Sequence, residues 1–186
     1  MTADEWVRRF EEAFAREANE EVDFTALGEE LGKDRTLSQA QYEEVLRRIA
    51  GKLFSPTFST VLDYCLGHRG FPSEEFWIDV ILSARDWDVG GKILDALLPF
   101  VDLTGFVCKL LPKVRDLPEK EHRRISFVVW AATCSGSINI PAGDRFLMKE
   151  AVQPEALALE IKKWRPYFKQ AYDRDSLERA LRSLGE

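Results

Sequence analysis

Cysteine and histidine are scarce in this sequence, which limits its redox chemistry and its capacity to hold metals. Its 186 residues include three cysteines, Cys65, Cys108 and Cys134, which lie far apart among apolar neighbours and form no C-x-x-C pair. His68 and His122 are its two histidines. We therefore expect reduced thiols in the core, with no disulfide framework, no metal site and no other cofactor.

Long apolar runs are absent as well. The longest strongly apolar stretch runs from Ile125 to Ala132, well short of the roughly 20 residues that a membrane-spanning helix needs. The segment from Met1 to Phe14 carries charges in every turn, unlike a secretory signal. We expect a cytoplasmic protein without a membrane span.

Familiar catalytic signatures are also missing. The sequence has no G-x-x-x-x-G-K-[ST] phosphate loop, no G-x-S-x-G elbow and no H-E-x-x-H pair. Cys65 and His68 are close enough in sequence for a thiolate–imidazole pair. However, we expect Gly67 to end the helix between them, and a buried thiol beside a surface histidine is the simpler interpretation. We do not expect an enzyme; a site assembled from scattered residues is the alternative left open.

Helix start signals, in contrast, recur along the chain. Thr2 with Glu5 and Ser38 with Gln41 form capping boxes, and apolar residues then follow at three- and four-residue spacing. An apolar content of 45% is sufficient for a substantial core. The pattern predicts one all-α domain over residues 1–186, a compact multi-helix domain of about ten short helices.

The remaining helices are expected at positions set by capping residues, prolines and glycines. Asp23, Asp88, Thr104 and Asp175 should each cap the start of a helix. Further helices should occupy Ser55 to Gly67, Pro72 to Ala84, Pro118 to about Cys134, Phe146 to Val152, and Pro154 to Pro166. The segment from Ser135 to Asp144 lacks helical periodicity and is expected to be a loop.

The spacing of these helices suggests stacked hairpins. Between Ser38 and Ser135, corresponding helix starts fall about 30–35 residues apart, within the range of helical repeats. The segment LDALLPFVD, from Leu94 to Asp102, resembles the second helix of a HEAT-like repeat. This resemblance rests on apolar spacing, extends over about half the chain, and implies a short α-solenoid. A compact irregular bundle is the other architecture that the pattern allows.

Charge is distributed unevenly along the chain. The net charge of −6 combines 21 acidic and 11 basic residues from Met1 to Leu103 with 11 acidic and 15 basic residues from Thr104 to Glu186. Between Ser73 and Leu103, Arg85 and Lys92 alone oppose seven acids. A concentrated negative field attracts basic proteins and repels nucleic acid. We therefore expect a basic protein partner, although solvated helix faces would explain the same charges without one.

These features favour a protein-binding module that engages a basic partner through an acidic helical surface. An immunity protein or an antitoxin-type inhibitor of a toxin would combine small size, acidity and stand-alone folding in this way. Tryptophan and buried charges commonly dominate such interfaces. The predicted contact residues are Glu74, Glu75, Asp79, Asp86, Trp87, Asp88 and Asp95.

The C-terminal segment KKWRPYFK suggests a different partner. Basic residues interleaved with aromatic residues can hold phosphates while stacking bases. The candidate residues for nucleic-acid or phosphate binding are Lys162, Lys163, Trp164, Arg165 and Lys169. The competing interpretation is ordinary packing, with aromatic rings turned inward and lysine stems along the edge. Nucleic acid is the less favoured partner because the chain as a whole is acidic.

Overall fold

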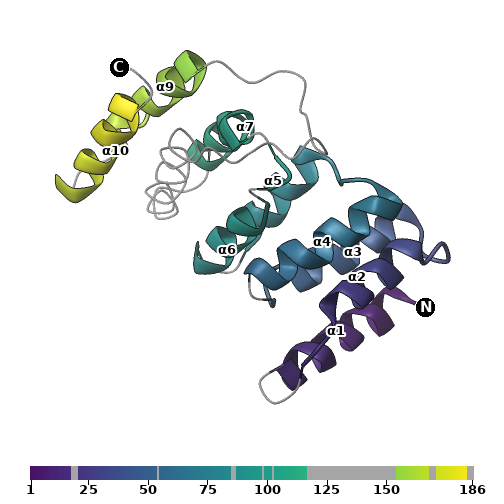
Figure 1. The fold of residues 1–186 in the computed structure, drawn as a ribbon. Coiled ribbons are helices and arrows are strands. Elements are labelled where there is room, and N and C mark those ends of the chain that lie inside the picture. The colour runs from purple at the N-terminus through teal and green to yellow at the C-terminus, as the bar shows by residue number, and fades with distance from the viewer. Residues whose placement is uncertain are drawn as a thin grey trace. The chain divides into compact units, whose positions relative to one another are not determined.

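The computed structural model describes residues 1–17, 21–53, 55–84, 87–97, 99–101, 103–116, 154–167 and 171–183. All regular secondary structure in these ranges is helical, which confirms the predicted all-α class (Figure 1). The chain divides into two compact units, Met1–Leu97 (unit 1) and Leu98–Glu186 (unit 2). Whether the whole chain behaves as a single domain stays a prediction.

The helices of each unit have the following bounds. Unit 1 contains α1 (Ala3–Glu17), α2 (Phe24–Lys33), α3 (Gln39–Ala50), α4 (Ser55–Arg69), α5 (Glu74–Leu82) and α6 (Trp87–Leu97). Unit 2 contains α7 (Leu103–Arg115), α9 (Pro154–Lys162), the 3₁₀ helix η2 (Arg165–Tyr167) and α10 (Ala171–Ser183). Within the described ranges, no helix combines the length and apolar character needed to cross a membrane.

The predicted capping signals set the starts of the first three helices. The Glu5 amide donates to Thr2 Oγ1 at 3.2 Å, and the Thr2 amide donates to Glu5 Oε2 at 2.7 Å. Ser38 and Gln41 form the same reciprocal pair at the start of α3. Asp23 caps α2. Each side chain satisfies an amide that has no partner inside its helix, which is why the local sequence predicts these starts.

The end of α4 was predicted incorrectly. The helix continues through Gly67 to Arg69, and the residue with a left-handed backbone is Gly70, with φ of 78°. A glycine inside a helix costs only about 1 kcal/mol, which tertiary packing readily offsets. Glycine ends a helix where the chain needs positive φ, and that position is Gly70.

Three predicted helix caps are also wrong, and one of them is Thr104, which lies inside the first turn of α7 (Leu103–Arg115). α6 begins at Trp87, so Asp88 lies inside its first turn. α10 begins at Ala171, ahead of the expected cap at Asp175; alanine favours helix strongly, and a capping residue does not prevent a helix from starting earlier. The helices predicted for 118–134 and 146–152 and the loop 135–144 lie outside the described residues.

A close seam joins α2 to α4 in the core of unit 1. A Cβ atom on Gly28 would lie 2.8 Å from the Val61 carbonyl oxygen, and one on Gly32 would lie 3.1 Å from Cys65 Cα. The backbones approach this closely because two glycines, four residues apart, share one face of α2. Since Gly28 faces Val61 and Gly32 faces Cys65, the two helices run in the same direction.

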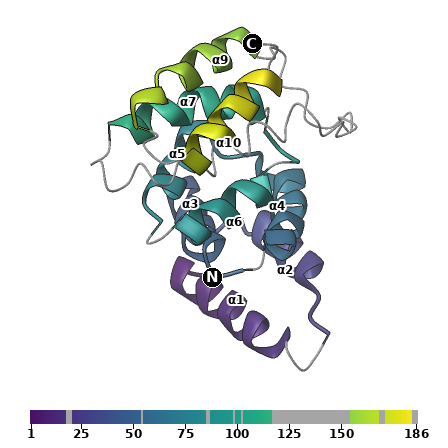
Figure 2. The same cartoon turned by 90° about the vertical axis from the view of Figure 1, so that its left-hand side faces the viewer.

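The other helices of unit 1 complete this arrangement. α1 packs along α3, α4 packs against α6, and α5 packs against α6. Figure 2 shows α2 and α4 together on one side of the unit and α3 on the other. Trp77 of α5 is fully buried and makes ring contacts with Phe58, Phe71 and Phe76. Paired parallel helices are compatible with stacked hairpins, and the HEAT-like architecture stays a prediction.

Unit 2 is organised around α9, which packs against both α7 and α10. Its buried side chains include Phe106 and Leu110 of α7, Ile161 of α9, Trp164, and Leu181 of α10. Pro112 lies within α7.

Candidate functional site

The predicted acidic surface lies on α5 and α6 of unit 1. Among its residues, Glu75, Asp79 and Asp95 are exposed and Glu74 is half-buried. Glu75 and Asp79 are four residues apart and share one face of α5. Trp87 and Asp88 belong to the first turn of α6, but the structure describes only their backbone. Asp86 lies outside the described residues. Their joint role in binding stays a prediction.

Part of this charge has a local structural role. Ser73 caps α5 by accepting a hydrogen bond from the Phe76 amide at 3.1 Å. Glu74 and Glu75 follow in the first turn, where the helix dipole favours negative charge. Asp79 and Asp95 lie outside first turns, so the dipole does not account for their presence.

Elsewhere in unit 1, five carboxylates of α1 and α2 are matched by cations. The pairs are Asp4 with Arg48 at 2.5 Å, Glu30 with Arg9 at 2.5 Å, Glu12 with Arg8 at 3.8 Å, Glu11 with Lys52, and Glu29 with Lys33. In contrast, no described cation forms an ion pair with Asp63, Glu75 or Asp95. The surplus negative charge of unit 1 therefore includes carboxylates on α4, α5 and α6.

Asp95 stands out among these carboxylates. Partial burial raises its pKa above the ordinary aspartate value, because a neighbouring protein surface solvates a charge less well than water. Lys92, three residues earlier on the same helix, is also exposed but forms no described ion pair with it. A cation supplied from outside would stabilise the charged form of Asp95.

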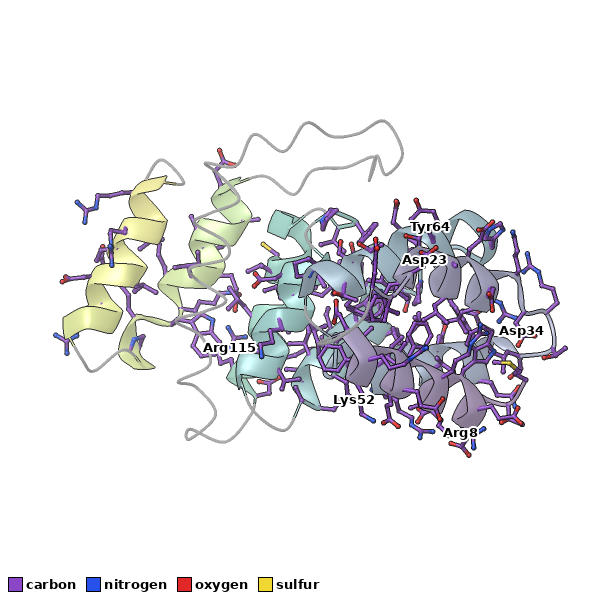
Figure 3. All side chains as sticks on the ribbon, turned by 60° about the horizontal axis from the view of Figure 1, so that its bottom comes forward. Arg8, Asp23, Asp34, Lys52, Tyr64 and Arg115 are labelled. Carbon is purple, nitrogen blue, oxygen red and sulfur yellow. The ribbon has the colours of Figure 1, made fainter. Side chains whose placement is uncertain are left out.

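A cleft between the beginnings of α2 and α4 is a feature that the sequence did not reveal. It has a volume of about 590 Å³ and is lined by Glu21, Val22, Asp23, Phe24, Thr25, Pro56, Thr57 and Thr60. Tyr64, one turn beyond Thr60, is 41% exposed. In Figure 3, Asp23 and Tyr64 lie at the same edge of unit 1, away from Arg8 and Lys52. The sequence predicts Asp23 only as a helix cap, and the Gly28–Gly32 spacing is the signal that could place α2 beside α4.

The Cys65–His68 pair is not a nucleophile and its base. Cys65 is fully buried, its thiol donates to the Gly28 carbonyl at 3.2 Å, and burial raises the pKa of this thiol to about 12. His68 lies at the surface, 3.9 Å from Glu29. A thiol with so high a pKa is protonated at neutral pH and is a poor nucleophile. The predicted buried thiol and surface histidine are confirmed.

Asp34 has the most strongly perturbed carboxyl in the described part of unit 1. Its pKa lies well below the usual range because Thr36 donates from both its hydroxyl, at 2.5 Å, and its amide, at 2.9 Å, and because the Trp6 indole donates at 2.7 Å. Arg69 fixes the same loop by donating to the carbonyls of Asp34 and Leu37, the latter at 2.8 Å. These contacts hold the α2–α3 connection in place, which is a structural role.

The basic aromatic segment of unit 2 is largely used for packing. Trp164 is fully buried, so it is not accessible for stacking on a base, which corrects its predicted role. Lys163 lies 2.8 Å from Glu160, and Arg165 lies 3.2 Å from Glu178. Lys162 is half-buried, and Lys169 lies outside the described residues. Cations already matched by carboxylates have less to offer a phosphate backbone.

No group of three or more histidine, cysteine, aspartate or glutamate side chains in the described ranges is placed to hold a metal ion. Comparison of the chain with protein-family models, with curated proteins and with solved structures found no match.

Proposed function

We propose that this chain is a protein-binding module that engages a basic partner through an acidic helical surface on α5 and α6. The observation that carries the proposal is the imbalance of charge pairing within unit 1. Asp4, Glu11 and Glu12 of α1 have cation partners, whereas Glu75 of α5 and Asp95 of α6 have none among the described residues. Unmatched surface carboxylates raise the association rate of a basic partner and favour its orientation in the complex.

Within this class, an immunity-type or antitoxin-type inhibitor is the specific role that we propose. Such a protein needs a stable scaffold and a charged surface but no active site. The aromatic cluster around Trp77 and the glycine seam between α2 and α4 give unit 1 a well-packed scaffold. The partner would then be a toxin whose basic surface this chain covers.

The test is affinity capture from the source cell with three forms of the full chain. The surface variant carries Glu75→Lys, Asp79→Lys and Asp95→Lys. The matched control carries Glu12→Lys, Glu17→Lys and Glu44→Lys, which change the net charge equally at exposed positions on α1 and α3. Captured proteins are identified, purified and titrated against each form by calorimetry.

We expect a basic protein that binds the wild type and the control but not the surface variant, with affinity that falls as salt is raised. If the partner is a toxin, the wild-type chain should also suppress its activity. Equal weakening by the two variants would show that net charge alone matters and would contradict a localised surface. A partner that is acidic, or one that binds all three forms equally, would contradict the proposal.

A further inference from the structure

The cleft between α2 and α4 lies where two parallel helices begin. Because α2 and α4 run in the same direction, Asp23 at the start of α2 and Thr57 at the start of α4 come to the same end of unit 1. Both line the cleft of about 590 Å³. A cleft of this size is large enough for one long side chain of a partner and a neighbouring residue.

The lining of the cleft is polar and carries negative charge. Glu21 and Asp23 are exposed, and no described cation pairs with either carboxylate. Asp23 Oδ1 accepts the Ala26 amide at 3.0 Å, so its second oxygen is left for another donor. Thr60 donates its hydroxyl proton to the Pro56 carbonyl at 3.0 Å, so its hydroxyl oxygen can still accept a hydrogen bond. These groups suit a cationic donor with several N–H groups.

The exposed side of α4 extends the same surface. Thr57, Thr60 and Tyr64 follow one another at three- and four-residue spacing, so they form one stripe along the helix. Tyr64 is 41% exposed, and Asp63 beside it is exposed with no described ion pair. Beyond them, a Cβ atom on Gly67 would meet nothing within 4 Å. The surface of α4 at Gly67 is therefore open, and a partner can approach the stripe there.

We propose that this cleft and the adjoining Asp63–Tyr64 turn receive an arginine-bearing segment of the basic partner. The inference rests on the proposed function, since it needs a basic partner, and it adds a second contact region to the one on α5 and α6. One guanidinium enters the cleft between the Glu21 and Asp23 carboxylates. A second lies over the Tyr64 ring, where cation–π attraction acts, and the exposed Asp63 carboxylate on the adjacent face of α4 adds electrostatic attraction.

Charge complementarity decides whether the group that occupies the cleft is a cation or an anion. Helix N-termini attract anions through their partial positive charge, and two of them lie at this cleft. The Asp23 side chain already occupies the start of α2, and two full negative charges outweigh the partial charges of the helix ends. The cleft therefore favours a cation over an anion.

The test uses fluorescence anisotropy with the full chain and a fluorescein-labelled peptide of alternating arginine and alanine. A peptide of alternating glutamate and alanine has the opposite charge. The cleft variant carries Glu21→Gln, Asp23→Asn and Asp63→Asn; asparagine preserves the helix cap at residue 23. The matched variant carries Glu75→Gln, Asp79→Asn and Asp95→Asn on α5 and α6. Circular dichroism checks that both variants fold.

We expect the cleft variant to weaken binding of the arginine peptide about tenfold and the matched variant to weaken it by less than about threefold. Tyr64→Ala should weaken binding about threefold, whereas Tyr64→Phe, which keeps the ring, should retain it. Loss of binding in the matched variant alone would overturn the inference and leave the proposed function standing. Equal loss in both variants, or preference for the glutamate peptide, would overturn it too. No binding by the wild type would count against both proposals.

Discussion

The two units use their charged residues in different ways. In the described part of unit 1, ion pairs lie at the surface and carboxylates such as Asp63, Glu75 and Asp95 have no cation partner. In unit 2, Glu160 is 6% exposed and contacts Arg115 at 2.5 Å and Lys163 at 2.8 Å. The acidic unit thus presents its surplus charge to solvent, whereas in unit 2 the pair between Arg115 of α7 and Glu160 of α9 holds these two helices together.

This difference shows why net charge along a sequence is an incomplete guide to binding. Thr104 to Glu186 carries a positive balance, which favoured a nucleic-acid site as an alternative. Yet Lys163 and Arg165 have carboxylate partners, and Trp164 is buried. What matters for a partner is which charges remain exposed and unmatched after folding. Substitutions at carboxylates that differ in burial and pairing test that distinction.

Glu160→Gln should be the most destabilising of these changes. It removes the negative charge from a buried site that two cations contact, and hydrogen bonds to charged groups contribute about 1.5–3 kcal/mol each. We expect the free energy of unfolding to fall by about 2 kcal/mol. Urea denaturation measures this loss, and hydrogen exchange locates it in α7 and α9. Glu178→Gln, at a half-exposed pair with Arg165, should cost less than about 1 kcal/mol. Equal losses would contradict the contrast drawn between buried and exposed charges.

Asp34→Asn should produce a smaller loss that depends on pH. The folded state lowers the pKa of Asp34, so its charge stabilises the fold above the unfolded carboxyl pKa of about 3.9, and this contribution disappears as pH falls. At pH 7 we expect a loss of about 1–2 kcal/mol, with the gap to wild type closing in acid. Asp63→Asn is the control, an exposed aspartate whose replacement should change stability by less than about 0.5 kcal/mol. A gap that is constant with pH would contradict the prediction.

Asp95→Asn should have the smallest effect, with the opposite sign. Burial raises the pKa of Asp95 in the folded state, so the folded chain binds this proton more tightly than the unfolded chain. Its charge therefore opposes folding above that pKa, and the penalty is relieved as pH falls. Because the side chain is exposed and solvent screens its charge, we expect a gain of no more than about 0.5 kcal/mol at pH 7. The gain should vanish in acid, and urea denaturation at neutral and at acidic pH measures it. A loss of stability at pH 7 would mean that a cation pairs with Asp95 in solution.

The helical class and several helix starts could be predicted because their signals are local. The capping pairs Thr2–Glu5 and Ser38–Gln41 act within one turn, so neighbouring residues suffice to recognise them. The end of α4 was missed because Gly67 and Gly70 are equivalent as letters, and only the backbone angle at Gly70 distinguishes them. The start of α6 was missed for a similar reason: Asp88 suits a cap and a first turn equally well.

The candidate site was predicted less completely. The acidic residues of α5 and α6 could be named from the sequence because charge can be counted without coordinates. The cleft beside Asp23 could not, since its second wall comes from Thr57 and Thr60, which are distant in the chain. The loss of Trp164 as a stacking residue has the same origin, because burial depends on what packs against the ring.

The sequence by itself determined the all-helical character, the amphipathic faces and the amount of charge in each part of the chain, because these depend on residue type and short-range spacing. The tertiary structure alone decided which carboxylates meet cations, that Gly28 and Gly32 bring α2 against α4, and that this pairing opens a cleft. The physical reason is distance. Ion pairing, burial and close backbone approach act over a few ångströms between residues that folding brings together.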